Sequence, residues 1–582
     1  MEDLYNKASL VLTPQMVEAG KVYSMKPEDR KGDFTFSRST AATRVNASGN
    51  IEKETGNLLV QSNQFDTSWE KSDVTITSGF VGYDGTNNAW ELTRTATAYA
   101  RMNQAVTQSG VYAHSIYAKA GTLNWISIGP TGGGEGTWFN LSNGTIGIEG
   151  SLIKHSSIES VGNGWYRISI VVNNPGNQWF RFYPSDVDGG DESATATGTI
   201  YVQDAQLEQG LVARDVITTT TTAIYGGITD NVPRLDYTDS SCPALLLEPQ
   251  RTNQVENSEY YESYAFSRVS ISSNATASPE GSLNASELVE DLTNENHFFR
   301  IPNLSFTSGT DVVFSIYLKE NTRRYSRLRF DNTGGNTRVW LDLRTGEVTF
   351  IDNTDNGVCT STDVGNGWFR YEFKVTPSNT GTGSVQIFTQ SVESVLGSLQ
   401  TTYQGDGSSG IYVYGAQVEA GSYATSYIPT YGSAVTRNED NTTITNLQSN
   451  NIAGDTFSYF FEWGDYVADR NFEIRDSSNT NFFFMVSRLF RYNNESGGVD
   501  SLMILPTSGT ALKCMVTYDG TTLKGFVNGA VEGSVTDAKA SQFSDFNYLR
   551  LDRDHPDSEE LRSLMIFPTA LTDQEAIDLT TI

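Results

Sequence analysis

Short runs in which apolar and polar residues alternate recur along the chain, separated by turn residues. After Asn366–Gly367, for example, apolar side chains alternate with charged ones as far as Val375. A period of two puts the apolar side chains on one face of a strand and the polar side chains on the other. Asn-Gly favours the tight turn that joins antiparallel strands. The pattern therefore predicts hairpins with one face in a core and the other face outward.

Two long stretches of the chain carry the same pattern. The segment Val161–Arg167 reads VGNGWYR and recurs as VGNGWFR at Val364–Arg370. Further matches lie in the same order around it: Ser115–Lys119 with Ser315–Lys319, and Ile200–Glu208 with Ile411–Glu419. Matched segments in one order predict a duplicated domain, in which small loop insertions change the spacing.

Length and composition agree with a chain of several all-β domains. A chain of 582 residues is too long for one core, and 52 glycines with 19% charged residues suit short strands and many turns. We therefore predict tandem antiparallel β-sandwich (jelly-roll) domains with an N-terminal extended arm. The expected divisions are an arm or attachment segment at 1–56, a first repeat with its connector at 57–230, a linker at 231–252, a second repeat with its connector at 253–439, and a different sandwich at 440–582.

The last unit has signals of its own. Strand-like alternation on both sides of Asp519–Gly520, followed by a second turn at Asn528–Gly529, predicts consecutive hairpins. Near the end of the chain, Thr572 and Glu575 have the spacing of a capping box, which predicts a short helix.

Charge and cysteine content narrow the classes of partner. The formal net charge of −29 argues against a nucleic-acid partner, because binding phosphates needs clusters of Lys and Arg. The apolar run Ala8–Leu12 is too short to cross a bilayer and follows no basic leader, so we expect no membrane insertion. Cys242, Cys359 and Cys514 lie too far apart to suggest a disulfide framework or a metal knuckle.

The sequence shows no motif typical of a catalytic or metal site. His114, His155, His297 and His555 are isolated from one another and from cysteine. The two acids of a glycoside hydrolase need only meet in space, so that alternative stays open. We expect no enzyme activity and no cofactor, while calcium held by loop Asp and Asn oxygens, without named ligands, is a further alternative.

Aromatic residues on the polar faces of predicted strands form a candidate ligand site. Large aromatic side chains on a solvated face are unusual, and a sugar ring stacks on an aromatic plane with polar groups at its rim. The alternative is that loops or a partner chain cover the rings. The candidate carbohydrate-binding residues are Trp125, Trp138 and Asn140 in the first repeat, and Tyr325, Trp340 and Asp342 in the second.

One further aromatic pair is predicted to be structural. Trp165 and Trp368 each precede an arginine by two residues, which places ring and guanidinium on one face of a strand. This spacing favours a Trp–Arg stack in each repeat.

Several of these segments resemble known families. The opening Asn57–Phe65 and the closing Ile200–Glu208 resemble those of carbohydrate-binding-module-like jelly rolls. Tyr518–Gly529 together with Ile566–Thr572 resembles the LamG-like, concanavalin A-like jelly roll. The whole arrangement is similar to virion proteins of tailed bacteriophages, a resemblance that also uses the segments Ala8–Leu12, Asp33–Arg38, Ile428–Thr430 and Thr436–Asn438.

This resemblance implies a non-enzymatic component on the exterior of a phage virion, such as a tail fibre, a head fibre or a capsid decoration. It implies contacts with other virion proteins through the N-terminal arm, and self-association into a homo-oligomer. It also implies host attachment through glycan binding by the β-sandwiches. The alternatives are a capsid-decorating protein without a receptor role, a polysaccharide-degrading enzyme and a secreted bacterial adhesin.

Overall fold

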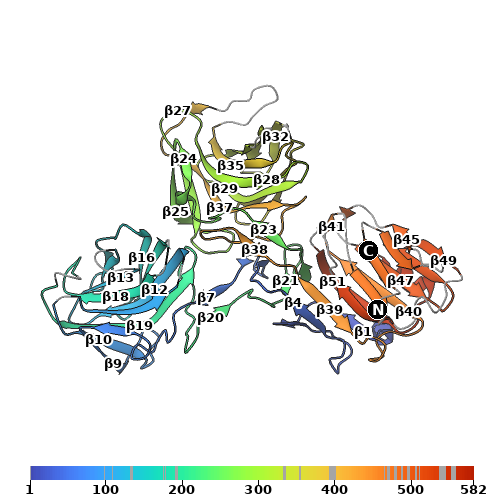
Figure 1. Cartoon of the computed structure of the whole chain (residues 1–582), viewed down its shortest axis with the longest axis horizontal. Coiled ribbons are helices and arrows are strands. Elements are labelled where there is room, and N and C mark those ends of the chain that lie inside the picture. Colours follow the sequence, from blue (N-terminus) through green and yellow to red (C-terminus); the bar gives the residue numbers. More distant parts are fainter. Residues whose placement is uncertain are drawn as a thin grey trace.

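In the computed structural model, three β-sandwiches meet at a central junction (Figure 1). This arrangement confirms the all-β class and the tandem antiparallel sandwiches expected from the sequence. The structure describes residues 2–581 except for 98, 108, 131–134, 175, 177, 191–193, 332–335, 353–354, 392–401, 465, 468–471, 477–481, 487–488, 494–498, 505–507, 510–511, 537–545 and 552–558.

The first sandwich consists of two facing antiparallel sheets. Core side chains from both sheets, such as Leu92 and Ile168 from one and Ile126 and Phe180 from the other, form a single cluster. One sheet runs in the order β16 (Ile153–Gly162), β17 (Trp165–Asn174), β12 (Gly110–Ala120), β19 (Gly198–Gln209), β10 (Ala89–Arg94) and β9 (Val74–Phe80). The other runs β15 (Thr145–Ile146), β14 (Thr137–Asn140), β13 (Trp125–Gly129), β18 (Gln178–Ser185), β11 (Arg101–Val106) and β8 (Glu70–Ser72).

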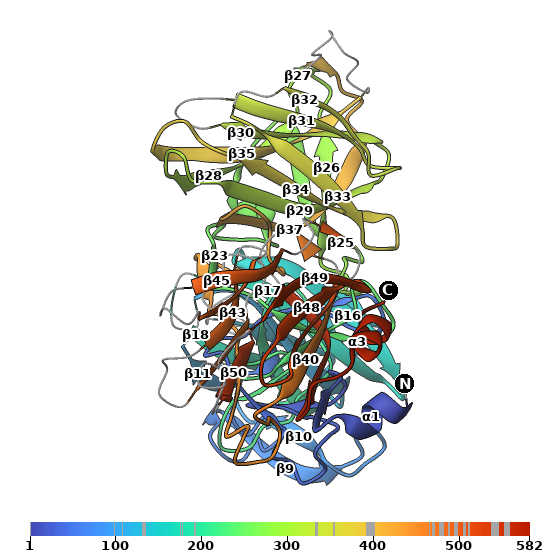
Figure 2. The same cartoon turned by 90° about the vertical axis from the view of Figure 1, so that its right-hand side faces the viewer.

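The second sandwich has the same strand order with its own residues. One sheet runs β25 (Val269–Thr276), β26 (Ala285–Glu290), β37 (Gly410–Ala420), β29 (Val312–Glu320), β34 (Trp368–Val375) and β33 (Val358–Asp363). The other runs β24 (Ala265–Ser267), β28 (Phe298–Phe306), β35 (Gly381–Gln390), β30 (Tyr325–Asp331), β31 (Asn336–Asp342) and β32 (Val348–Asp352). We call this second sheet the outer sheet of the second sandwich, because it faces away from the junction (Figure 2).

The two tryptophans of the repeated segment occupy equivalent places, but their predicted arginine stacks are wrong. Trp165 lies opposite Lys119, and Trp368 lies opposite Lys319, at the start of equivalent strands. The arginines two residues later stack on tyrosines of the neighbouring strand instead, with guanidinium-to-ring-centroid distances of 5.5 and 5.7 Å. The spacing of two residues shows that Trp and Arg share a face, but not which ring the arginine contacts. The register between neighbouring strands decides this, and it places a tyrosine opposite each arginine.

Each repeat holds its own connector in the same way. The Nδ2 of Asn253 donates to the carbonyls of Ala416 and Ile428 at 3.2 and 2.8 Å. In the first repeat, Asn57 makes the equivalent pair of hydrogen bonds to Ala205 and Ile217. The connectors then pair with the opening strands of their repeats, as β7 (Thr55–Asn57) with β20 (Ile224–Gly226) and β23 (Arg251–Asn253) with β38 (Val435–Arg437).

The third sandwich takes its strands from distant parts of the chain. One sheet runs β21 (Arg234–Asp236), β22 (Ala244–Leu247), β51 (Glu559–Phe567), β40 (Phe457–Trp463), β47 (Leu512–Tyr518), β48 (Leu523–Val527) and β49 (Ala530–Val535), with β1 (Leu10–Leu12) also paired to β51. The other runs β2 (Val17–Glu18), β3 (Lys21–Val22), β4 (Phe34–Ser37), β39 (Asn441–Thr445), β50 (Phe546–Leu551), β42 (Phe472–Asp476), β43 (Phe482–Val486), β44 (Leu489–Asn493) and β45 (Val499–Ile504).

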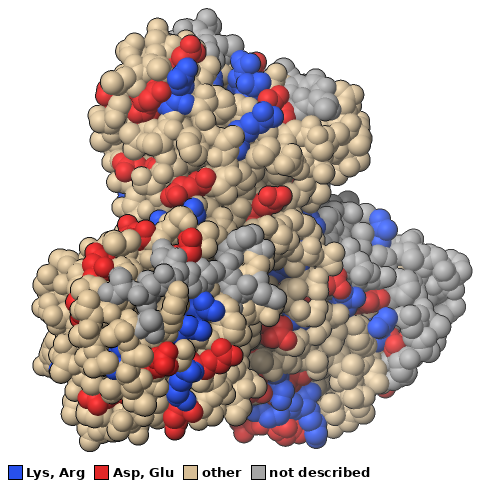
Figure 3. Space-filling model, turned by 60° about the vertical axis from the view of Figure 1, so that its left-hand side comes forward, with Lys and Arg blue, Asp and Glu red and all other residues tan. Residues whose placement is uncertain are grey.

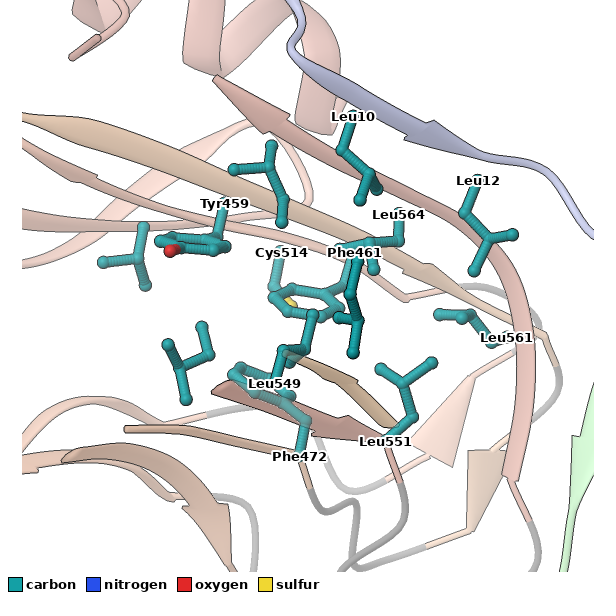
Figure 4. Close-up of a cluster of buried hydrophobic side chains, with 14 of the residues drawn as sticks. Leu10, Leu12, Tyr459, Phe461, Phe472, Cys514, Leu549, Leu551, Leu561 and Leu564 are labelled. Carbon is teal, nitrogen blue, oxygen red and sulfur yellow. The ribbon is translucent and has the colours of Figure 1, made fainter. Parts of the chain in front are cut away.

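The N-terminal segment is therefore not an extended arm. Leu10 and Leu12 pair with Ile566 and Leu564 and are fully buried. Figure 4 shows both leucines pointing into the core beneath β51. The expected linker at 231–252 likewise contains β21 and β22, which join the same sheet. The sequence predicted a linker rather than strands at 231–252, because nothing local to a short segment shows that its pairing partner lies hundreds of residues away.

The predicted hairpin and helix near the end of the chain are confirmed. β47 and β48 pair across the Asp519–Gly520 turn. Thr572 and Glu575 form the capping box of α3 (Asp573–Thr580). This helix lies beside α1 (Glu2–Lys7) at the edge of the third sandwich (Figure 2), where Lys7 and Glu575 form an ion pair. The shorter elements are β5 (Arg44–Val45) with β6 (Ile51–Glu52), β27 (Asn294–Glu295) with β36 (Tyr403–Gln404), β41 (Tyr466–Val467) with β46 (Ser508–Gly509), and the 3-10 helix η1 (Tyr261–Ser263).

A network of buried charges ties the third sandwich to the segments that lead into the repeats. Asp440 accepts hydrogen bonds from Arg38, at 2.8 Å, and from Arg234. Glu248 in turn pairs with Arg234 and Arg437, each at 2.5 Å. All five side chains are at most 2% exposed. Because buried charges need partners, each member depends on the others.

A second buried network lies between the first and second sandwiches. Arg214, from the first connector, pairs with Glu280 at 2.8 Å, and Glu280 also pairs with Lys53. Lys53 reaches Glu259 at 2.7 Å. The repeats are thus joined by ion pairs as well as by the chain.

These ion pairs predict a loss of stability in acid. Burial acts to raise the pKa of Glu280, but Lys53 and Arg214 outweigh it and hold the pKa below the ordinary value of 4.5. A lowered folded-state pKa contributes stability above the unfolded pKa, and that contribution is lost as pH falls below about 4.5. We expect the free energy of unfolding to fall by on the order of 2 kcal/mol for this group between pH 5 and pH 2.5.

Urea unfolding of the full chain at both pH values measures this effect, with Glu280→Gln as the comparison. The variant lacks the titrating group, so its stability is expected to change less with pH, although it starts lower at pH 5. An equal acid loss in both proteins would show that Glu280 is not a source of the pH dependence.

Candidate ligand-binding face

The structure brings the predicted residues of the first repeat onto one sheet but leaves only part of them accessible. Trp125 lies directly opposite Asn140 across β13 and β14. Trp125 and Asn140 are partly exposed, whereas Trp138 is only 1% exposed. Asn140 accepts hydrogen bonds from the backbone and hydroxyl of Ser142 and so shapes the following turn. The ring of Trp138 therefore has no face free for a sugar.

In the second repeat, neighbouring side chains contact the residues at the same positions more extensively. Tyr325 lies opposite Asp342, as Trp125 lies opposite Asn140, but Arg324 binds the carboxylate of Asp342 and stacks on the ring of Tyr325 at 5.1 Å. Trp340 is 1% exposed and packs against Phe350, with ring centroids 5.4 Å apart. Side chains of the neighbouring strands, rather than the loops or partner chain considered from the sequence, therefore cover the ring of Trp340.

A set of residues not selected from the sequence forms a groove on the outer sheet of the second sandwich. Cross-strand pairing aligns two rows of side chains on this face. One row reads Phe298, Phe388, Arg327, Trp340 and Phe350 across the sheet. The row beside it reads Arg300, Gln386, Arg329, Arg338 and Asp352.

The two rows enclose a hollow of about 220 Å³, which we call the arginine groove. Its aromatic part is the pair Phe298 and Phe388, whose ring centroids are 4.7 Å apart. Its lining residues are Asn296, Phe298, Arg327, Arg329, Arg338, Gln386 and Phe388. Apolar rings, amides and guanidinium groups therefore meet at one place.

Arg327 occupies the centre of the arginine groove with few partners. Its side chain is held between two rings, 3.8 Å from the centroid of Phe388 and 5.6 Å from that of Trp340. Its Nη2 donates to the amide oxygen of Asn296 at 2.9 Å, while its Nε has no hydrogen-bond partner among the described residues. The residue is 2% exposed.

Burial, followed by repulsion from Arg338 and Arg329, lowers the pKa of Arg327 to about 9. The charged form is disfavoured because the buried guanidinium loses its hydration and has like charges beside it. Arg338 is 3.5 Å from Asp352, and Arg329 is 3.6 Å from Asp331, so both of these flanking arginines do have acidic neighbours. Among the described residues, no carboxylate forms an ion pair with Arg327.

The sequence did contain a signal for this groove. Arg327 and Arg329 alternate with Leu328 and Phe330, so two arginines share the outward face of one strand. The pairing register of the strands decides whether these arginines also lie beside Arg338 and two phenylalanines. The alternation within one strand does not specify that register.

The first sandwich has a different surface at the equivalent place. The residue between Trp138 and Tyr183 is Ser127, where the second sandwich has Arg327. Two residues on, Gly129 stands where the second sandwich has Arg329. Of the two repeated sandwiches, only the second therefore has the arginine groove.

Two of the four histidines, His114 and His297, lie in structural surroundings, and His555 lies outside the described residues. His114 is fully buried and stacks on Phe180 at 5.2 Å, and burial lowers its pKa to about 3. His297 contacts the backbone carbonyls of Arg268 and Tyr403. Within the described ranges, no three His, Cys, Asp or Glu side chains are grouped as metal ligands would be. Over the same ranges, no helix has the length and apolarity needed to span a bilayer.

Comparisons with solved structures find distant likenesses. A CBM40 of the Ruminococcus gnavus IT-sialidase, bound to alpha2,3 sialyllactose, is 12% identical over 22% of this chain and 84% of its own, with a TM-score of 0.19. The CBM22-1–CBM22-2 tandem domain of Paenibacillus barcinonensis Xyn10C is 11% identical over 62% of this chain and 97% of its own, with a TM-score of 0.20. The Trypanosoma rangeli sialidase in complex with DANA is 8% identical over 94% and 98%, with a TM-score of 0.19.

These three likenesses bear neither on the ligand nor on the chemistry of this chain, because their TM-scores are about 0.2. No family model matches the chain, and no curated protein sequence matches it either.

Proposed function

We propose that this protein binds saccharides without catalysis, through the outer sheet of its second sandwich. The observation that carries the proposal is the arginine groove, where the partly exposed ring of Phe298 lies beside Asn296 and Gln386. An aromatic surface contacts the C–H face of a sugar ring, and amides at its rim hydrogen-bond to hydroxyl groups. The Oε1 of Gln386 is buried in the lining of the groove and has no hydrogen-bond partner among the described residues, so a ligand hydroxyl that enters the groove would find an acceptor there.

The wider setting of this function is proposed from sequence resemblance. The segments similar to tailed-phage virion proteins support a component of the virion exterior, which attaches the particle to glycans of a host surface. A homo-oligomer would multiply weak sites into useful avidity. Anchoring through an N-terminal arm is not part of the proposal, because those residues form strands of the third sandwich. Immunogold labelling of purified particles tests the location; unlabelled particles would contradict it.

Saccharide binding is expected to weaken when an aromatic side chain of the groove is removed. Phe298→Ala removes a partly exposed ring, so we expect the Kd to rise roughly five-fold, as for the loss of about 1 kcal/mol of stacking. The probe is a glycan array that carries neutral and acidic oligosaccharides, followed by titration calorimetry with the best-bound oligosaccharide.

Phe266→Ala is the matched control for this experiment. Phe266 is a 51% exposed phenylalanine on the same sheet, and it pairs with core-facing Phe299 rather than with the groove row. The control is expected to bind as the unaltered protein does. Equal affinity in all three proteins would contradict the placement of the site, and an array without any bound saccharide would contradict the function.

A further inference from the structure

The charge of the arginine groove does not match the charge of the chain. With 69 acidic against 40 basic residues, the protein has acidic side chains scattered over its surface, and Figure 3 shows them across the face drawn there. Against this background, Arg327, Arg329 and Arg338 converge on one hollow. Three like charges at short range repel one another and reduce stability unless anions neutralise them.

The acidic neighbours within the groove leave this charge only partly neutralised. Asp331 and Asp352 each serve one of the flanking arginines at about 3.5 Å, longer than a direct charge-assisted hydrogen bond. Over the part of the chain that the structure describes, Arg327, the most buried of the three, has one hydrogen-bond acceptor, the amide of Asn296, and its Nε makes no hydrogen bond. A buried cation without an anion is costly, so the site has unfilled capacity for a negatively charged group.

The geometry of the donors and rings identifies the kind of anion. Guanidinium groups present paired N–H donors that match the two oxygens of a carboxylate. Phe298 lies on the same row as Arg327 and is partly exposed, so it offers an apolar surface to the ring that carries the anion. The buried ring of Phe388 instead supports the guanidinium of Arg327, 3.8 Å from its centroid. A compact inorganic anion would use the arginines and leave the Phe298 ring idle, whereas an acidic sugar uses both.

We propose that the second sandwich selects saccharides that carry a carboxylate, such as uronic-acid residues, with Arg327 receiving the carboxylate and Arg329 and Arg338 flanking it. This inference rests on the proposed saccharide-binding function and specifies its ligand class. The first sandwich, with Ser127 at the equivalent place, does not share this selectivity.

The test compares acidic polysaccharides with their carboxyl-reduced counterparts, which keep the sugar backbone and lose the charge. Polygalacturonate oligomers and carboxyl-reduced oligomers of equal length are the probes, titrated into the full chain at low and at physiological salt. We expect binding of the acidic oligomers, roughly thirty-fold or more weaker binding of the reduced ones, and weakening by salt.

Variants separate recognition from folding. Arg327→Ser installs the residue of the first repeat, and we expect it to abolish the preference for the acidic oligomer. Because it removes a buried cation without a carboxylate partner, its thermal unfolding midpoint is expected to stay or rise. Arg338 is partly exposed, and Arg338→Gln is expected to weaken the preference for the acidic oligomer as well. Arg344→Gln is the charge control, since Arg344 is 60% exposed and pairs with Glu320 outside the groove.

The outcomes are distinct for the two proposals. If the protein binds neutral and carboxyl-reduced oligomers as tightly as acidic ones, and Arg327→Ser changes nothing, the carboxylate inference is wrong while saccharide binding stands. If neither these oligomers nor any saccharide on the array binds, both proposals are wrong. If Arg344→Gln weakens acidic binding as much as Arg327→Ser does, general charge rather than the groove is responsible, and the inference is again overturned.

Discussion

A chain that lacks residues 2–13 is expected to lose the folded third sandwich. The deletion removes β1, whose Leu10 and Leu12 are fully buried against β51. Burial of leucine side chains in a core is worth about 2–5 kcal/mol each, and the deletion also uncovers the edge of β51. Hydrogen exchange followed by mass spectrometry on peptides from 559–567 measures the effect, because it reports on this sandwich separately from the others.

Point variants make the same prediction without removing backbone. Leu12→Ala is expected to destabilise the third sandwich by about 2–5 kcal/mol. Met16→Ala is the control, since Met16 is 53% exposed in the same segment and surface changes usually cost within about 0.5 kcal/mol. A truncated chain that keeps full protection of β51 would show that the N-terminal segment is an accessory after all.

Asp440→Ala is expected to cost about 3–5 kcal/mol, because it leaves Arg38 and Arg234 buried without their shared carboxylate. Asp440 also accepts the backbone N–H of Glu248 at 2.9 Å, so a backbone donor loses its partner too. Three separate segments of chain meet at this one side chain. Chemical denaturation of the full protein, monitored by tryptophan fluorescence, measures the loss.

Glu439→Ala provides the comparison from the neighbouring residue. The carboxylate of Glu439 is 49% exposed and lies 3.9 Å from Arg550, a pairing that contributes at most about 1 kcal/mol. If Asp440→Ala and Glu439→Ala lowered the free energy of unfolding equally, burial at the junction would not be what makes the Asp440 ion pairs important for stability.

The sequence predicted what is local and repeated. Asn366–Gly367 and the alternation after it specify a hairpin strand, and the matched segments place Trp165 and Trp368 on equivalent strands. The capping box at Thr572 is likewise a local signal, satisfied within one helical turn. Such features depend on neighbouring residues and on steric preferences that hold in any fold.

The sequence did not predict pairings between distant segments. Residues 2–57 include β1 and β4, whose distant partners are β51 and β39, and nothing in their own pattern distinguishes an arm from a strand that joins a remote sheet. The candidate site was missed for a related reason. The outward face of Trp340 was identified correctly, but the neighbours that cover its ring come from β30 and β32, and their register decides exposure.

The pairing of β1 with β51 has a consequence for the order of events during synthesis. Leu12 and its partner Leu564 are separated by more than five hundred residues. A ribosome that adds about 5–20 residues per second needs roughly half a minute to two minutes between them. The first two sandwiches are complete in the meantime, while β1 waits for β51 and the early groups β2–β4 and β21–β22 have only one another to pair with. Closure of that sandwich is therefore the last step, and a ribosome that stalls before β51 releases a chain with two finished domains and a set of open strand edges available to chaperones and proteases.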